Sequence, residues 1–457
     1  MDKLILLTNN LNSERVAVTF FYFDYMDPLN QTAEDIIAAI LKQLLYQMPS
    51  LLPEIESAYD RCMQKGPEAR PDRDSLVQLI KQCTRQFDRT FVVIDAMDEC
   101  NERQRSKLLS CLQQLVHAGS VKMFITNRPH IINEIRANIS GGSVDIEAKR
   151  DEVEAYLRAE LKGKSPQLHH TLSEKIVTRV GAKSDGQYSP PRSSLIDRFL
   201  LAEFQLGFVL DKYNPRDMAD ALENLPKTLP DAYGEIMKRI DKKGHGAKTI
   251  ALKALSWIFH AKRPLHIEEL VELLLVRWGD RALSEEYRMP AADVIDCCQS
   301  LIIYNPISGI VEFSHYTVQE YFRSNVVGLA PVAELAVGCL AYIKLDEFAI
   351  GPCTNSGDLN LRRQTHRAIQ SVAEFWGDFV REVEDVSFVQ ERTLIALADQ
   401  GRRDAIVQLV CAGAQPWRDP KHFPAGRTVL SLLAGVGLAK ICAAVLNNRQ
   451  RFRLEAR

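Results

Sequence analysis

The chain has 457 residues, of which 46% are hydrophobic and 25% are charged, and its formal net charge at pH 7 is -2. A chain of this length is expected to form about two to four domains of roughly 100–200 residues each, and its apolar content excludes a disordered protein. The small net charge gives no overall field that would favour nucleic acid or an anionic membrane.

Cysteine usage and hydropathy indicate the cellular compartment. The ten cysteines are scattered and form no CxxC pair, so the sequence indicates neither a zinc ribbon nor a disulfide framework. No apolar run reaches the roughly 18–20 residues that cross a bilayer, and the start of the chain has no cleavable signal pattern. We therefore expect a cytoplasmic protein without a membrane span.

The first 160 or so residues predict alternating strands and helices. Val16 to Asp24 is β-branched and aromatic on both faces, as in an interior strand of a parallel sheet. An amphipathic helix to Met48 follows, opened by a capping-box pattern at Thr32 and Asp35. A second helix is expected from Ser75 to Phe87.

An acidic cluster follows the next predicted strand, Thr90 to Ile94. Its members are Asp95, Asp98 and Glu99. A further strand, Val121 to Ile125, ends in Thr126-Asn127-Arg128. Ligands of open α/β sheets bind outside the carboxyl ends of the strands, where a carboxylate can hold Mg²⁺ and an arginine can reach a terminal phosphate. The two strand ends therefore predict one ligand site.

Other interpretations of these residues stay open. The acidic residues can simply cap a helix, because carboxylates are common in first helical turns, and Arg128 can be a surface cation. A metal-binding DxxD of the prenyl-diphosphate kind fits poorly, because the preceding residues are strand-like and no second acidic cluster is evident. The occurrence of both features in order, about thirty residues apart, favours the ligand site.

Both segments resemble parts of NACHT-type signalling ATPases. FVVIDAMDEC, residues 91–100, is similar to their Walker B segment, and FITNRP, residues 124–129, is similar to their sensor 1 strand. The best resemblance is to the filamentous-fungal group whose ATPase segment is nephrocystin-like. It implies that Asp95 serves Mg²⁺, that Asp98 and Glu99 orient water or support the site, and that Arg128 senses the terminal phosphate of ATP.

The same resemblance covers the segments around this core. Val144 to Glu147 and the helix from Asp151 resemble the family's last core strand and helix. The family's phosphate-binding loop, GxxxxGK[ST], occurs nowhere in the chain, although its backbone amides, lysine and hydroxyl hold the phosphates and Mg²⁺. In the family it lies just upstream of the first strand, and Met1 to Asn12 resemble the tail of the helix after it.

We therefore expect an incomplete NTPase core at residues 1–162, with no ATP or ADP bound and little or no hydrolysis. A natural truncation and a gene model that begins at a downstream methionine both account for the missing loop. Residues 163–247 resemble the family's small helical domain. The family runs directly into a helix resembling FLLAEFQL, so Tyr188 to Arg198 is interpreted as an inserted Pro- and Ser-rich surface loop, either a tolerated insertion or a retained intron.

Residues 248–325 predict three helices and a hairpin that turns at Asn305 to Gly309, which is typical of a winged helix. The region has no dense basic stripe, so packing is favoured over DNA binding. FSHYTVQEYF, residues 313–322, resembles the family's winged-helix signature and implies that His315 contacts the nucleotide. A partly buried histidine bonded to backbone is the alternative.

Residues 326–390 predict further helices, and residues 391–457 predict two degenerate ankyrin-like repeats. Thr393 and Thr428 lie 35 positions apart, and each is expected to begin a helix–turn–helix unit. A generic helical hairpin is the alternative. Two repeats are too few for an isolated solenoid, so they are expected to pack on the preceding helices or to continue into further repeats.

The predicted architecture is an incomplete parallel α/β sheet of the P-loop NTPase type, followed by helical, winged-helix and ankyrin-like regions. Two functions stay open. One is a NACHT-type signalling or scaffold protein that binds protein partners through its C-terminal region; the other is a hydrolase whose P-loop is missing only from this sequence. The resemblance implies homo-oligomers and a role in fungal innate immunity or self/non-self recognition, with no nucleic-acid partner.

Overall fold

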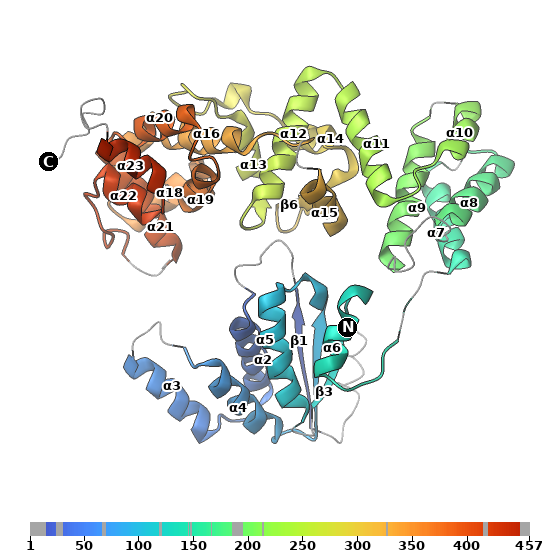
Figure 1. The fold of residues 1–457 in the computed structure, drawn as a ribbon, viewed down its shortest axis with the longest axis horizontal. Coiled ribbons are helices and arrows are strands. Elements are labelled where there is room, and N and C mark those ends of the chain that lie inside the picture. Colours follow the sequence, from blue (N-terminus) through green and yellow to red (C-terminus); the bar gives the residue numbers. More distant parts are fainter. Residues whose placement is uncertain are drawn as a thin grey trace. The chain divides into compact units, whose positions relative to one another are not determined.

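The fold was analysed in a computed structural model of the chain (Figure 1). The residues that it describes are 15–23, 31–65, 70–117, 121–144, 146, 149–165, 167–184, 195–212, 214–325, 328–414 and 419–447. The chain divides into two compact units, Met1–Leu229 and Pro230–Arg457.

The first unit contains a three-stranded parallel sheet. Its strands are β1 (Val16–Tyr22), β2 (Arg89–Asp95) and β3 (Val121–Ile125), with β2 in the middle. The register places Val93 between Phe20 and Phe124. Because the strands are parallel, their carboxyl ends meet at one edge of the sheet, as the sequence predicts.

Helices pack against one face of this sheet. α2 (Ala33–Gln47) begins after Thr32, whose hydroxyl accepts a hydrogen bond from the Asp35 N–H at 3.2 Å, so the predicted cap is confirmed. Its buried Ile36 and Ile40 share a core with Ile94 of β2. The other helices are α3 (Pro53–Lys65), α4 (Arg73–Thr84), α5 (Glu102–Val116) and α6 (Ile132–Asn138).

β1 differs from the interior strand that the sequence predicts. It lies at one end of the described sheet, and Phe20 and Tyr22 are exposed. Its outer edge is capped by α2. The Gln43 amide donates to the Phe20 carbonyl at 2.8 Å and accepts from the Phe20 N–H at 2.9 Å. Gln47 pairs with Val18 in the same way, at 2.9 and 3.0 Å. Side-chain amides therefore satisfy backbone groups that a neighbouring strand would bind.

The prediction of a last core strand at Val144 to Glu147 is wrong for the residues that can be checked. Val144 and Ile146 belong to no strand and are 85% and 69% exposed, whereas a core strand would be buried. Among the described strands β3 pairs only with β2, so this segment has no backbone partner there. Asp145, Glu147 and the predicted helix tail at Met1 to Asn12 lie outside the described residues.

A second core in the first unit is helical. It is formed by α7 (Arg150–Lys164), α8 (His170–Ser184), α9 (Leu195–Leu210) and α10 (Pro215–Ala221), and it includes Leu157, Val180 and Leu206. The predicted surface loop at Tyr188 to Arg198 is wrong for residues 195–198, which form the first turn of α9. An acidic residue in that turn, Asp197, favours helix formation there. Residues 188–194 lie outside the described part.

The second unit opens with helices around a small antiparallel sheet. The helices are α11 (Leu229–Lys242), α12 (His245–His260), α13 (Ile267–Leu275), α14 (Ala291–Cys297) and α15 (Tyr316–Ser324). The strands β4 (Leu265–His266), β6 (Ile310–Phe313) and β5 (Ile302–Tyr304) lie in that order. The predicted hairpin turn is confirmed, with Gly309 at φ 72°. β4 was not predicted, because two residues carry no periodic pattern.

The remaining helices form the C-terminal part of the second unit. They are α16 (Val332–Ile343), α17 (Asp346–Ala349), α18 (Ser356–Thr365), α19 (Ile369–Glu382), α20 (Ser387–Ala396), α21 (Gln400–Ala414), α22 (Val429–Gly435) and α23 (Ala439–Asn447). Thr428 caps α22, as predicted. Thr393 does not begin a helix. It lies inside α20, where its hydroxyl donates a hydrogen bond to the Val389 carbonyl at 2.8 Å. The hydroxyl therefore has a partner within the helix and does not cap a helix start.

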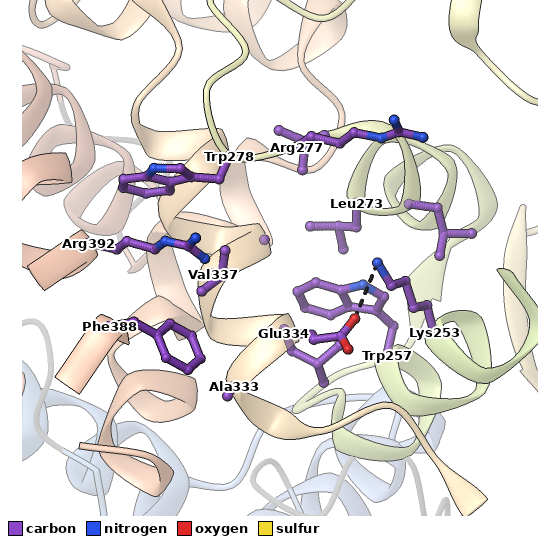
Figure 2. A pocket seen from close by; sticks show the side chains of 14 residues that line it. Lys253, Trp257, Leu273, Arg277, Trp278, Ala333, Glu334, Val337, Phe388 and Arg392 are labelled. Atoms are coloured by element: carbon purple, nitrogen blue, oxygen red, sulfur yellow. Dashed lines mark ion pairs between the residues drawn. The ribbon is translucent and has the colours of Figure 1, made fainter. Parts of the chain in front are cut away.

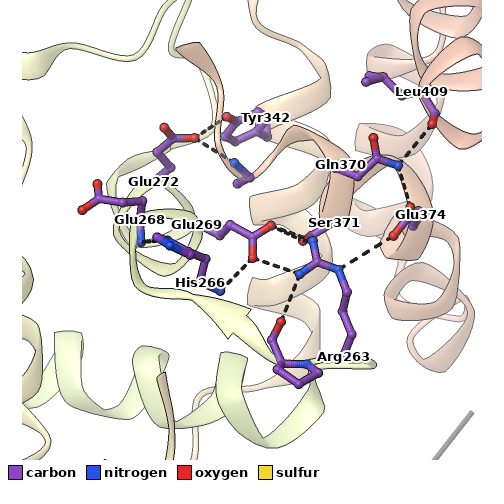
Figure 3. Close-up of polar contacts among 12 residues, drawn as sticks. Arg263, His266, Glu268, Glu269, Glu272, Tyr342, Gln370, Ser371, Glu374 and Leu409 are labelled. Carbon is purple, nitrogen blue, oxygen red and sulfur yellow. Dashed lines mark hydrogen bonds and ion pairs between the residues drawn. The ribbon is translucent and has the colours of Figure 1, made fainter. Parts of the chain in front are cut away.

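A buried carboxylate joins α13 to these helices (Figure 3). Glu272 has no exposed surface and accepts hydrogen bonds from the Tyr342 hydroxyl at 2.5 Å and the Ala368 N–H at 3.0 Å. Its other oxygen lies 3.7 Å from Nη1 of Arg288. Burial, reinforced by the charge of Glu272, raises the pKa of Tyr342 well above its usual range, so the phenol stays protonated and donates.

Candidate functional site

The predicted acidic cluster lies at the carboxyl end of β2. After Asp95 the chain turns through Ala96, at φ 54° and ψ 46°, into the short 3-10 helix η2 (Met97–Glu99). This left-handed conformation is costly for a residue with a Cβ atom. Two bonds to Thr126 hold it: the Ala96 N–H donates to the threonine hydroxyl at 2.9 Å, and the Met97 N–H donates to its carbonyl at 3.0 Å. The end of β3 therefore fixes the turn that carries Asp98 and Glu99.

Thr126 also binds Asp95 directly. Its hydroxyl donates to Oδ1 of Asp95 at 2.5 Å, and its N–H donates to the Ile94 carbonyl at 2.9 Å. Within the described part of the chain, Oδ2 of Asp95 accepts no hydrogen bond. One oxygen of this carboxylate is thus held in place while the other remains available to a ligand.

Arg128 and Asp98 form an ion pair. Nε of Arg128 lies 3.1 Å from Oδ2 of Asp98, and the Arg128 N–H donates to Oδ1 at 3.1 Å. Both oxygens of Asp98 are therefore bonded to one residue, and only 8% of its side chain is exposed. For Asp98 to orient water or Arg128 to meet a phosphate, this pair would have to open.

Asp197 is the residue of this site that the sequence did not reveal. It lies in the first turn of α9, and its Oδ1 is 3.7 Å from Nη1 of Arg128. The guanidinium therefore lies between two carboxylates that are far apart in sequence. The sequence does contain a helix-start pattern here, an acidic residue followed by an apolar helical run. It was missed because Asp197 belongs to the stretch that was interpreted as an inserted loop.

The residues present fit one part of a Mg²⁺ site. Among the described residues no group of three or more His, Cys, Asp or Glu side chains is placed to hold a metal ion. Mg²⁺ in nucleotide sites usually takes one or two carboxylates and completes its shell with phosphates and water. Asp95, with one oxygen available, fits such a ligand, whereas Asp98 does not while both of its oxygens are bonded to Arg128. Glu99 is half-buried and follows Asp98 directly.

His315 belongs to the second unit, where it is the N-cap of α15. Its Nδ1 accepts from the Thr317 N–H at 3.3 Å and lies 2.7 Å from the Thr317 hydroxyl. That hydroxyl is 2.6 Å from the hydroxyl of Tyr233 on α11. The structure shows the backbone bond that the sequence left open as an alternative, and the nucleotide contact of His315 stays a prediction.

Replacing His315 with alanine is expected to destabilise the second unit by about 0.5–2 kcal/mol, because the N-cap acceptor of α15 is lost. His315→Asn should stay close to wild type, since asparagine supplies an acceptor at the same position. Urea unfolding followed by tryptophan fluorescence measures both. If the asparagine variant loses as much stability as the alanine variant, capping is not what His315 contributes.

Comparison with known proteins gives matches to two parts of the chain. Residues 4–128 match the family "Nephrocystin 3, N-terminal", and residues 238–337 match the family "GPI inositol-deacylase, winged helix domain". A Walker-type ATPase of Pyrococcus abyssi is similar in structure, with 10% identity and a TM-score of 0.29 over 70% of this chain and 95% of that one. No curated protein matches the chain.

The two family matches coincide with the two parts that carry the candidate residues. The first contains β1, β2 and β3 with Asp95 and Asp98, and ends at Arg128; the second contains α12, α13, the antiparallel sheet and His315. No helix in the described ranges is long and apolar enough to cross a membrane. Residues 4–128 are thus similar to the N-terminal part of nephrocystin 3, and residues 238–337 are similar to the winged-helix domain of GPI inositol-deacylase.

Proposed function

We propose that this chain is a NACHT-type signalling or scaffold protein that acts by binding other proteins and hydrolyses little or no nucleotide. The observation that carries the proposal is the environment of Arg128. Asp98 and Asp197 lie 3.1 and 3.7 Å from its guanidinium, so the residue that would sense a phosphate is already neutralised. A phosphate would have to replace at least one of these carboxylates.

The sequence supports the same proposal. The 457 residues contain no GxxxxGK[ST], so nothing in them supplies the cradle of backbone amides and the lysine that hold the phosphates of ATP. Phosphoryl transfer depends almost wholly on positioning and on electrostatic stabilisation. Asp95 without a phosphate partner would hold Mg²⁺ weakly, because the ion needs phosphate oxygens to complete its shell.

We assign partner binding to the C-terminal helices. α22 packs against α23, whereas α20 packs against α16 and α21 against α19 and α17. From their order in the chain, α20–α21 and α22–α23, we interpret these helices as two degenerate ankyrin-like repeats. These helices expose large apolar side chains, namely Phe388, Ile395, Val410 and Leu446. A protein partner that covers these side chains would remove their apolar surface from water. We also propose that the chain forms homo-oligomers and acts in innate immunity or self/non-self recognition.

A second candidate is an ATP- or GTP-hydrolysing switch. It is favoured by the available oxygen of Asp95 and by the strained turn at Ala96, which keeps the acidic residues at the strand end. Strained backbone that its surroundings hold in place is often found at functional sites.

Phosphate release from Mg²⁺–ATP separates the two candidates. The wild-type chain is expected to release phosphate no faster than Asp98→Asn, Glu99→Gln, or buffer without protein. Melting temperatures of all variants establish that they are folded. A rate well above background that both substitutions abolish would instead establish the hydrolase.

A further inference from the structure

A pocket of about 440 Å³ opens in the second unit, lined by residues of α12, α13, α16 and α20 and by the segment after α13 (Figure 2). Its volume lies within the ~300–1,000 Å³ range of small-molecule sites. Three aromatic side chains line it: Trp257 of α12, Trp278 after α13, and Phe388 of α20. The pocket is separate from Asp95 and Arg128, which belong to the first unit.

Small residues on α16 keep the pocket open. Ala333, Val337 and Gly338 line it from this helix. A Cβ atom on Gly338 would come within 3.1 Å of Cζ2 of Trp257, closer than such contacts normally are. The absence of that atom allows the indole to lie against α16, where it is almost fully buried. On the α16 side, the wall of the pocket therefore consists of the Trp257 indole and small side chains.

The charges around the pocket are unbalanced. It is lined by three cationic side chains, Lys253, Arg277 and Arg392, and by one carboxylate, Glu334. Glu334 is already paired with Lys253 at 3.2 Å. Within the described residues neither arginine side chain has an ion pair or a hydrogen bond, so positive charge is left over at the mouth of an apolar cavity. Such a site favours a ligand with a negative group.

Arg392 is the cation that the structure holds in place. Its guanidinium lies 5.1 Å from the ring centroid of Trp278 and 5.4 Å from that of Phe388. Figure 2 shows it between these two rings, directed into the pocket. Cation–π contacts orient a guanidinium without neutralising it. Its donors therefore remain available to an anion inside the pocket, where a charge-assisted hydrogen bond is stronger than in bulk water.

We propose that this pocket binds a small molecule that combines an apolar body containing aromatic rings with one anionic group. The rings lie against Trp257 and Phe388 in the apolar part, and the anionic group accepts hydrogen bonds from Arg392. The assignment does not depend on nucleotide binding by the first unit.

Two fluorescent probes test the assignment on the chain of 457 residues. Anilinonaphthalene sulfonate has aromatic rings and one sulfonate, and phenylnaphthylamine has similar rings without a charge. Arg392→Gln is expected to weaken binding of the sulfonate by about tenfold or more, the effect of losing a hydrogen bond between charged groups. Binding of the uncharged probe should change by less than about twofold, because the apolar wall remains.

Two further variants complete the test. Arg367→Gln removes an exposed arginine outside the pocket and should leave both affinities unchanged. Ala333→Phe fills the pocket from the first turn of α16 and should weaken both probes. The proposal is overturned if the sulfonate shows no saturable binding, or if Arg392→Gln binds it as tightly as the wild-type chain does. Melting temperatures show whether each variant folds. If Ala333→Phe does not fold, the result for Arg392→Gln alone decides the outcome.

Discussion

Replacing Arg263 with methionine is expected to lower the free energy of unfolding of the second unit by about 2–4 kcal/mol. The substitution leaves Glu269 of α13, which is only 5% exposed, without its counter-ion. Removing one member of a buried ion pair is costly, because the remaining charge loses its partner and is still shielded from water. The expected loss is at the lower end of the usual range, since the Arg263 side chain is 32% exposed.

The contacts of this pair account for the size of the effect (Figure 3). Arg263 donates to both oxygens of Glu269, at 2.7 and 3.1 Å, and to the hydroxyl of Ser371 on α19. Glu269 also accepts from the Ser371 hydroxyl at 2.7 Å and from the His266 N–H at 2.8 Å. Burial lowers the pKa of Arg263, but the bond to Glu269 and the charges of Glu269 and Glu374 more than offset this and raise it.

Urea unfolding of the second unit, followed by the fluorescence of buried Trp257 and Trp376, measures the change. The double variant Arg263→Met, Glu269→Gln should recover most of the lost stability, because the buried carboxylate charge is gone and the amide oxygen can still accept a hydrogen bond. Arg281→Met is the matched control. It breaks the exposed pair with Asp346, at 3.5 Å, and should cost less than about 1 kcal/mol. A double variant no more stable than Arg263→Met alone would contradict this explanation.

Local sequence patterns predicted most of the individual elements. The cap at Thr32 and the hairpin turn at Gly309 were found because each depends on residues close together in the chain. The strand at β2 was found because its apolar run is continuous and is followed by acidic residues. These features need no knowledge of tertiary contacts.

The features that were missed all depend on distant contacts. The outer edge of β1 is capped by Gln43 and Gln47, and no periodic pattern in the sequence connects polar residues on a helix with a strand about 25 residues earlier. Val144 to Glu147 has a strand-like composition, but a strand also needs another strand with which its backbone can form hydrogen bonds. Thr393 has the pattern of a helix start, yet its hydroxyl bonds within α20.

The candidate site was predicted only in part. The sequence placed Asp95, Asp98 and Arg128 at adjacent strand ends, because parallel strands bring their carboxyl ends to one edge. It did not predict that Asp98 and Arg128 bond to each other, since both were assigned to a bound ligand. It also missed Asp197, whose contact with Arg128 spans about 70 residues of chain.

Calorimetric titration of Mg²⁺–ATP and Mg²⁺–ADP into the wild-type chain tests the central claim most directly. The account predicts no saturable heat at micromolar concentrations, because Arg128 is held by two carboxylates and the sequence supplies no phosphate cradle. A dissociation constant near 1 μM would require about 8 kcal/mol of binding free energy. A micromolar site that is lost in Asp95→Ala, but kept in the control Asp74→Ala, which removes an exposed carboxylate of α4, would contradict the account.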